Sequence, residues 1–203
     1  MTSPQKDKEL ASLKKKMLSD LSLPLKKGAT NLVFGVGNSD TKVLFIGEGP
    51  GYWEDQKAEP FVGNAGKLLD GLLHSIDLPR PEVYITNVVH HRPPENRDPE
   101  PSEIAAYSPY LDQIIEIIKP KVIVTLGRFS MAKFLPGVKI TAIHGKPQRV
   151  KFSEREISIV PMYHPAAALR SSEVMRQIRE DFKIIPQVLS EKSKKVFDQM
   201  ELI

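Results

Sequence analysis

Residues 42–51, KVLFIGEGPG, join an apolar run to a glycine-rich turn. The apolar part, residues 43–46, is partly β-branched and bounded by turn residues, which is typical of a short buried strand. Glycines after such a strand let backbone N–H groups approach a ligand without interference from a Cβ atom. The turn, residues 47–51, is therefore a candidate ligand cradle, although a plain strand-to-helix turn has the same pattern.

The composition excludes several classes of site. The chain of 203 residues contains no cysteine, so it cannot form disulfides or sites built on thiolate ligands. Its net charge of +4 permits a polyanionic partner without requiring one. The first residues, MTSPQKDKEL, are charged, which does not fit a signal peptide. No run approaches the roughly 20 apolar residues of a membrane span, so we expect a soluble intracellular protein without a membrane partner.

Apolar strands alternate with helical segments along the chain. Four short apolar runs are predicted to be strands, at residues 43–46, 83–86, 122–126 and 157–162. Continuous apolar strands that alternate with helices indicate a parallel sheet covered on both faces. We therefore predict an α/β fold, a three-layer α/β/α sandwich with a central, mainly parallel four-stranded sheet. The polar segment 52–60 is predicted to be a loop, and residues 171–200 a helical region interrupted by Pro186.

Polar side chains follow all four predicted strands. Glu48 lies in the first turn, Asn87 follows the second strand, Arg128 the third and His164 the fourth. Ligands of open α/β sheets bind outside the carboxyl ends of the strands, so we expect these four residues at one edge of the sheet. Loops are polar in most proteins, so this placement does not by itself establish a site.

These residue types suit the recognition of a nucleobase. Asn87 offers donors and an acceptor, as the amide edge of a base requires, and a neutral His164 can donate to a developing anion. Phe61, near the first turn, can stack on a planar ring or pack in the core. The adjacent pair His90 and His91 would point to opposite faces of an extended chain, so we expect no metal site there.

Four ordered segments together resemble one protein family. They are GEGPGYWEDQKAEPFVGNAGKLL from residue 47, YITNVVHHRPPENRDPEPSEI from residue 84, IKPKVIVTLGRFSMAKFL from residue 118 and YHPAAALR from residue 163. Over roughly residues 31–181 they resemble the uracil-DNA glycosylase superfamily, and most of all its family 4 enzymes. The resemblance divides the chain into a basic N-terminal helix and connector, residues 1–30, and a glycosylase-like α/β/α domain, residues 31–203.

The resemblance implies roles for the matching residues. Phe61 matches the ring that stacks on uracil, Asn87 the amide that reads its edge, and His164 the histidine that stabilises negative charge on the departing base. With the turn included, the expected substrate-binding residues are Gly47, Glu48, Gly49, Tyr52, Phe61, Asn87 and His164. Residues expected to contact DNA are Pro50, Gly51, Asn96, Arg97, Arg128, Lys146, Ala166 and Arg170.

Catalysis is expected to depend on His164, Glu48 and Asn87. Backbone N–H groups of Glu48 and Gly49 can donate to a uracil carbonyl. Either Glu48 or Asn96 is a candidate to orient the attacking water. The family usually has alanine at the position of Gly49. Tyr52 is a candidate to exclude the methyl group of thymine.

One departure from the family is large. Family 4 members usually bind a four-iron four-sulfur cluster through four cysteines, and the corresponding positions here are Asp20, Leu23, His91 and Tyr107. None is a thiolate, so the cluster cannot form and we expect no cofactor. We expect packing, through Leu23 and Tyr107, to replace the cluster. A different metal at His91 is the alternative.

The resemblance predicts a monofunctional glycosylase that hydrolyses the N-glycosidic bond of deoxyuridine in single- or double-stranded DNA. We expect a monomer in the cytoplasm, associated with the nucleoid when bound to DNA. Three alternatives stay open: a glycosylase for hypoxanthine or xanthine, a non-catalytic relative that binds damaged DNA, and an unrelated Rossmann-type nucleotide-binding protein. The last predicts a G-x-G-x-x-G turn, which residues 47–51 do not provide.

Overall fold

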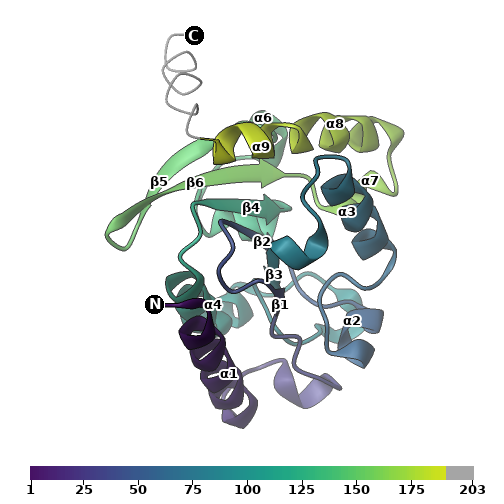
Figure 1. Ribbon diagram of the computed structural model, residues 1–203. Helices are drawn as coiled ribbons and strands as arrows, with labels where there is room; N and C mark the ends of the chain where they lie inside the picture. The colour runs from purple at the N-terminus through teal and green to yellow at the C-terminus, as the bar shows by residue number, and fades with distance from the viewer. Residues whose placement is uncertain (191–203) are drawn as a thin grey trace.

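Six strands form one sheet in the order β1-β3-β2-β4-β6-β5 in the computed structural model, which describes residues 1–190 (Figure 1). The four inner strands run parallel to one another, and the two edge strands are antiparallel to their neighbours. The α/β class and the mainly parallel sheet are therefore confirmed. The strands are β1 (Val36–Gly37), β2 (Val43–Gly47), β3 (Tyr84–Asn87), β4 (Val122–Leu126), β5 (Gln148–Phe152) and β6 (Arg155–Met162).

The predicted number of four strands is wrong, because both edge strands lack the apolar pattern of the inner ones. β1 has only two residues, and Gly37 in it adopts a φ of 125° beside the carbonyl oxygen of Val83, where a Cβ atom would collide. β5 alternates between half-buried and exposed residues and pairs with β6 across a short turn. A strand buried on one side only carries a weaker sequence signal than the wholly buried β2 and β4.

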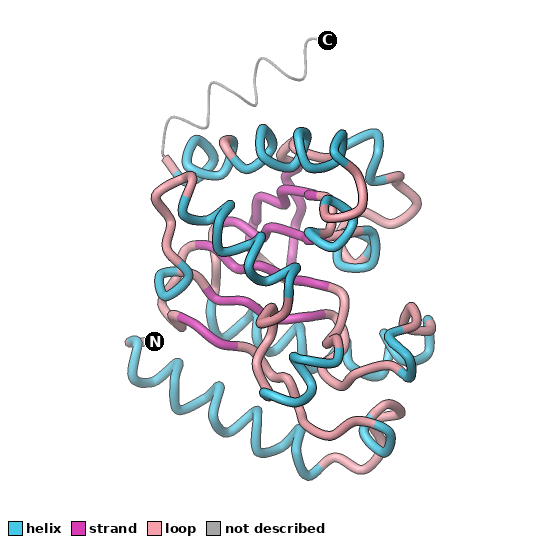
Figure 2. Tube along the Cα trace, turned by 90° about the vertical axis from the view of Figure 1, so that its right-hand side faces the viewer, coloured by secondary structure: helices cyan, strands magenta, loops and turns pink. Residues whose placement is uncertain are grey.

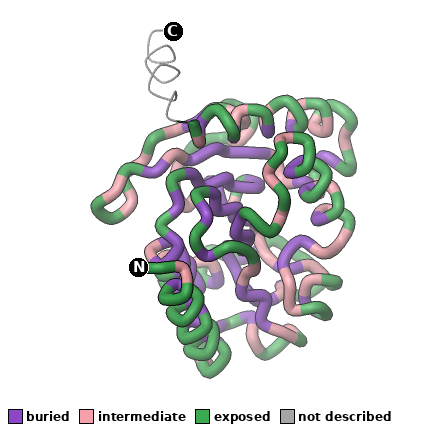
Figure 3. Tube along the Cα trace, in the orientation of Figure 1, coloured by how far each residue is buried: buried purple, intermediate pink, exposed green. Residues whose placement is uncertain are grey.

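Helices cover both faces of the sheet (Figure 2). Successive residues of a strand point to opposite faces, and those of β2 enter two different hydrophobic clusters. Leu44 and Ile46 pack in one with side chains of α1 and α4, and Val43 and Phe45 in the other with α3, α8 and α9. The inner strands β2, β3 and β4 are buried throughout (Figure 3). The helices are α1 (Ser3–Ser19), α2 (Tyr52–Lys57), α3 (Asn64–His74), α4 (Pro101–Ile118), α5 (Arg128–Ala132), α6 (Ile140–Ile143), α7 (Pro165–Ala168), α8 (Ser172–Phe182) and α9 (Ile184–Leu189).

The C-terminal helices only partly match the predicted helical region. That region is divided at Lys183, which lies between α8 and α9, rather than at Pro186, which lies inside α9. The last part of the predicted region, residues 191–200, lies outside the described residues, as do residues 201–203. Within residues 1–190 no helix is long and apolar enough to cross a membrane.

The N-terminal helix α1 packs against α4. Its buried residues Leu10, Leu13 and Met17 share a hydrophobic cluster with those of α4. The ammonium group of Lys6 donates to Asp40 over 2.7 Å and to the carbonyl oxygen of Ile118 over 2.9 Å. The division of the chain near residue 30 stays a prediction.

Helix α2 replaces the first part of the loop that we predicted at residues 52–60. Six residues are too few for a helix to be stable by itself, so tertiary contacts must hold it. The buried carboxylate of Asp55 accepts hydrogen bonds from the backbone N–H groups of Thr30 (2.9 Å) and Asn31 (3.1 Å). These bonds hold α2 beside the turn that follows β2.

Candidate functional site

A cavity of about 410 Å³ lies at the carboxyl ends of the parallel strands. In Figure 1 the arrowheads of β4 and β6 point toward the side where α3 and α7 lie. Three separate strands contribute to the cavity, through Glu48 after β2, Asn87 at the end of β3 and His164 after β6. The other predicted site residues in its lining are Gly49, Pro50, Gly51, Phe61, Asn96, Arg97, Ala166 and Arg170.

Among the predicted site residues, all of which belong to the described part of the chain, four do not line the cavity. Gly47 lies against it: a Cβ atom there would collide with the side chains of Asn87 and Phe61, so only glycine fits this position. The other three are Tyr52, Arg128 and Lys146.

These three side chains have other contacts. The half-exposed Tyr52 packs against Trp53, which does not support a role in excluding thymine. Arg128 forms an ion pair with Asp98, a cavity residue, and Lys146 donates to the carbonyl oxygen of Ala142 over 3.2 Å.

Asn87 presents an unpaired carbonyl oxygen. The residue is 1% exposed, and its Oδ1 atom has no hydrogen-bond partner among the described residues. A buried polar atom without a partner costs free energy comparable to a lost hydrogen bond. Because Asn87 lines the cavity, a ligand with an N–H donor would remove this cost.

His164 is set up as a neutral hydrogen-bond donor. Burial lowers its pKa to about 4, against a smaller opposing effect of the Glu54 charge, so the imidazole is uncharged near pH 7. Its Nδ1 atom accepts a hydrogen bond from the backbone N–H of Ala166 over 3.1 Å. In a neutral imidazole the other nitrogen then carries the hydrogen, so Nε2 is the atom that can donate to a ligand.

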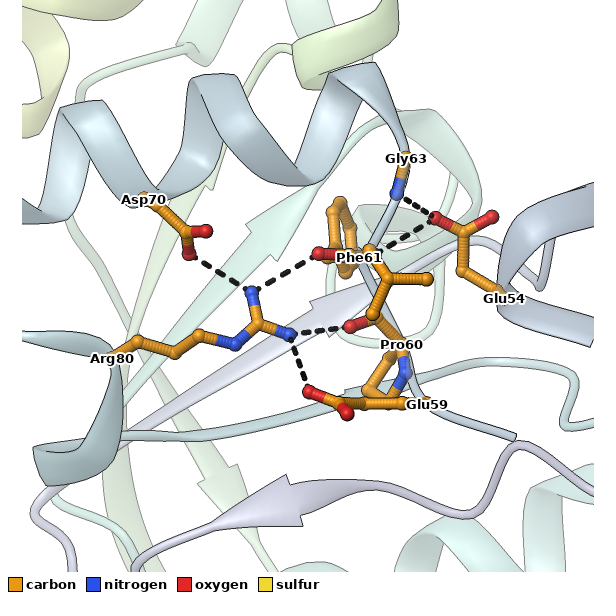
Figure 4. A network of polar contacts seen from close by, with 8 residues as sticks. Glu54, Glu59, Pro60, Phe61, Gly63, Asp70 and Arg80 are labelled. Atoms are coloured by element: carbon orange, nitrogen blue, oxygen red, sulfur yellow. Dashed lines mark hydrogen bonds and ion pairs between the residues drawn. The ribbon is translucent and has the colours of Figure 1, made fainter. Parts of the chain in front are cut away.

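Phe61 is held in an uncommon backbone conformation. Its φ is 54°, in the left-handed region that bulky residues avoid. The guanidinium of Arg80 donates to the carbonyl oxygens of Phe61 (3.2 Å) and Pro60 (Figure 4). Arg80 also forms an ion pair with Asp70 over 3.0 Å. The Phe61 ring stacks with that of His164, with centroids 5.6 Å apart.

Glu54 binds the backbone that follows Phe61. Its Oε1 atom accepts hydrogen bonds from the N–H groups of Val62 (3.0 Å) and Gly63 (2.9 Å). Arg80 thus binds the carbonyl groups of this turn while Glu54 binds its N–H groups, as Figure 4 shows. The two side chains together fix the ring of Phe61 at the cavity.

Glu48 has an unusually basic carboxylate. Burial, and to a lesser extent the charge of Asp98, raises its pKa to about 7, while Arg128 acts in the opposite direction. Near neutral pH the side chain is therefore divided between its acid and carboxylate forms. Such a pKa in a cavity is typical of groups that accept or transfer protons.

Several lining residues escaped the sequence analysis. Ala65 and Ala167 have small, uninformative side chains, although both lie within the quoted motifs. The residues Pro93, Asp98 and Pro99 lie in a proline-rich loop that has no periodicity. Glu54 was missed because its partners are N–H groups of a turn eight and nine residues away. The missed lining residues are Glu54, Ala65, Pro93, Asp98, Pro99 and Ala167.

The four positions that correspond to cluster ligands do not fit an iron–sulfur cluster. The hydroxyl of Tyr107 and Nδ1 of His91 share a hydrogen bond of 2.7 Å, and Asp20 accepts one of 2.6 Å from Tyr110. Burial lowers the pKa of His91 to about 4. Leu23 and Tyr107 are buried in the same hydrophobic cluster, which supports the packing hypothesis. Within residues 1–190 no group of three or more His, Asp or Glu side chains could hold a metal ion.

A family model and three similar proteins agree on one family. A model of the family described as "Uracil DNA glycosylase superfamily" matches residues 34–183. The chain is similar to three proteins named "Type-4 uracil-DNA glycosylase". The one from Sulfurisphaera tokodaii is 46% identical over 87% of this chain and 83% of its own. The one from Archaeoglobus fulgidus is 41% identical over 94% of this chain and 98% of its own. The one from Saccharolobus solfataricus is 45% identical over 80% of this chain and 78% of its own.

Replacing Tyr107 by Phe should destabilise the protein. The variant leaves the buried Nδ1 atom of His91 without a partner, at a cost of about 1–3 kcal/mol in the free energy of unfolding. The matched change, Tyr110→Phe, should cost less, because Asp20 keeps a hydrogen bond from Ser22. Urea unfolding of both variants measures the difference. Equal losses of unfolding free energy in the two variants would show that the His91–Tyr107 hydrogen bond stabilises the protein no more than the Asp20–Tyr110 bond.

Replacing Glu48 by Gln should stabilise the protein in a pH-dependent way. The folded-state pKa of about 7 lies above the ordinary value of 4.5, so the folded protein binds more protons than the unfolded chain between these pH values. Stability therefore falls as pH rises through this interval. Glu48→Gln should raise the free energy of unfolding at pH 8 and change it little at pH 4.

Urea unfolding at both pH values tests this prediction. Glu82→Gln, at an exposed position, is the control and should give no such difference. A stabilisation by Glu48→Gln that is the same at pH 4 and pH 8 contradicts the raised pKa.

Proposed function

Because this chain belongs to the uracil DNA glycosylase superfamily, we propose that it hydrolyses the N-glycosidic bond of deoxyuridine in DNA. The reaction releases uracil and leaves an abasic site. One observation carries the proposal: a single cavity is lined by a stacking ring, an unpaired amide oxygen and a neutral imidazole donor. These belong to Phe61, Asn87 and His164.

Uracil recognition is assigned to Phe61 and Asn87. The Phe61 ring stacks on the face of the base. The Oδ1 atom of Asn87 accepts from the N3–H group of uracil, and its side-chain N–H donates to the neighbouring carbonyl oxygen. Cytosine presents an acceptor and an amino group at the same positions, so both groups of Asn87 would lose their partners. Sites of this kind discriminate strongly.

His164 is proposed to stabilise the departing base. The base must first leave the helical stack, at a cost of a few kcal/mol that is least for a mispaired base such as uracil opposite guanine. Negative charge then develops on uracil as the glycosidic bond breaks, and Nε2–H of His164 donates to it. The backbone N–H groups of Glu48 and Gly49 are further candidate donors. A preorganised donor contributes about 2.7–4 kcal/mol to such a transition state.

Glu48 is assigned the role of orienting the attacking water and taking up its proton. A carboxylate whose pKa is about 7 accepts a hydrogen bond from water and takes up its proton more readily than an ordinary glutamate. Asn96 also lines the cavity and is the alternative for orienting the water. Glu48 is favoured because an amide cannot take up the proton.

We further propose that the protein acts as a monomer in the cytoplasm on single- or double-stranded DNA. The DNA backbone would follow the rim of the cavity, and basic side chains would neutralise phosphates there. The residues proposed to contact DNA are Pro50, Gly51, Asn96, Arg97, Ala166 and Arg170, with Arg128 and Lys146 outside the lining.

Excision of uracil tests the proposal directly. Oligonucleotides that contain uracil, hypoxanthine or xanthine are incubated with the protein, and abasic sites are cleaved with alkali. We expect cleavage of the uracil substrates. His164→Ala should reduce the rate about 10²- to 10³-fold while DNA binding persists.

The matched control is His144→Ala, which removes an imidazole that is bonded to Asp181 and lies outside the cavity lining. It should retain activity. Cleavage of only the hypoxanthine or xanthine oligonucleotides would assign that base as the substrate. No cleavage of any uracil oligonucleotide would contradict the proposal.

Replacing Arg80 by Ala should lower activity through Phe61. Left-handed conformations of non-glycine residues cost of order 1–3 kcal/mol, so without Arg80 the turn can relax and move the ring. A loss of about tenfold or more in kcat/KM is expected. Arg176→Ala, which breaks an exposed ion pair on α8, is the control and should change little. If Arg80→Ala folds and keeps the wild-type kcat/KM, Arg80 does not position Phe61.

A further inference from the structure

Two aromatic side chains lie exposed at the start of α2. Tyr52 is 49% exposed and Trp53 is 58% exposed. Among the large apolar side chains that are exposed within residues 1–190, these two are the aromatic ones. Aromatic rings have large apolar surfaces that are normally buried. An adjacent exposed pair therefore indicates a binding surface.

The pair is held in place before any ligand binds. The rings of Tyr52 and Trp53 meet edge to face, with centroids 5.1 Å apart and planes at 78°. The guanidinium carbon of Arg92 lies 5.2 Å from the centroid of the Tyr52 ring. The Nε atom of Arg92 donates to Oδ1 of Asn96 over 2.7 Å. The buried Asp55 fixes the helix that bears both rings.

This surface continues directly from the cavity. Gly51 and Glu54, the residues on either side of the aromatic pair, both line the cavity, as does Asn96, which holds Arg92. The carboxylate of Glu54 accepts hydrogen bonds from two backbone N–H groups. On the other side of the pair, Arg92 places a positive charge over the Tyr52 ring, which favours a polyanion.

We propose that Tyr52, Trp53 and Arg92 form a stacking platform for an unpaired base that neighbours the extruded nucleotide on the same DNA strand. Only an unpaired base exposes a face to an aromatic ring, whereas a paired base is already stacked in its duplex. Arg92 supplies a positive charge for the adjoining phosphate. The platform rests on the proposed function, and it predicts tighter binding to single-stranded DNA than the duplex contacts alone would provide.

The fluorescence of Trp53 tests the platform directly, because Trp53 is the only tryptophan of the chain. The full-length protein is titrated with oligodeoxythymidylate, which contains no uracil, and with a blunt duplex of the same length. Stacking should quench the fluorescence with the single strand and leave it nearly unchanged with the duplex. Equal responses to both DNA forms overturn the proposal.

Variants separate stacking from general attraction to DNA. Anisotropy of a labelled oligodeoxythymidylate measures affinity for Trp53→Ala, Trp53→Phe and Leu21→Ala, an exposed apolar control beyond the end of α1. Base stacking of this kind corresponds to roughly 5- to 150-fold in affinity. Trp53→Ala should lose about this much for the single strand but not for the duplex. Trp53→Phe should lose less, and Leu21→Ala nothing.

The outcomes distinguish this inference from the proposed function. Quenching by the single strand without any uracil excision keeps the platform and removes the glycosylase assignment. Excision of uracil without quenching removes the platform and keeps the glycosylase assignment. Wild-type affinity of Trp53→Ala for the single strand overturns the platform and leaves the aromatic pair for a partner other than DNA.

Discussion

The parallel pairing of β2 with β3 and β4 is the constraint on which the cavity depends. In parallel strands the carboxyl ends lie at the same edge of the sheet. The register pairs Gly47 with Asn87, and the absence of a side chain at Gly47 leaves room for the amide and for the ring of Phe61. One residue of slip would turn Asn87 to the other face of the sheet. Wholly buried apolar strands, packed from both sides, prevent that slip.

Folding changes the backbone conformation, the hydrogen bonding or the pKa of each group around the cavity. Asn87 has an unpaired buried oxygen, and Phe61 has a left-handed backbone. Glu48 ionises less readily than usual, and His164 protonates less readily. Such states persist only when surrounding structure enforces them. Arg80 and Glu54 do this for Phe61, and the N–H group of Ala166 orients His164.

The positions that correspond to cluster ligands lie apart from the ring of Phe61. His91 and Tyr107 form their hydrogen bond in the layer that α1 and α4 build on one face of the sheet. The ring of Phe61 belongs to the cluster on the other face. A buried, fully paired hydrogen bond between neutral groups needs no metal to hold these segments together. The sequence similarity to a Type-4 enzyme thus extends over 87% of a chain that contains no cysteine.

The sequence by itself determined the α/β class, the four inner strands and the convergence of Glu48, Asn87 and His164, because apolar periodicity and strand ends are local features. It missed the strands β1 and β5 and the helix α2, which are short and are held by distant partners. Tyr52 was expected to bind substrate, but it lies on α2 outside the lining, against Trp53. Arg128 and Lys146, expected to contact DNA, form their own contacts with Asp98 and Ala142. Only the tertiary structure decided the left-handed Phe61, the orientation of His164 and the raised pKa of Glu48. Each of these depends on groups that are close in space but not adjacent in the chain, or on burial that exists only after folding.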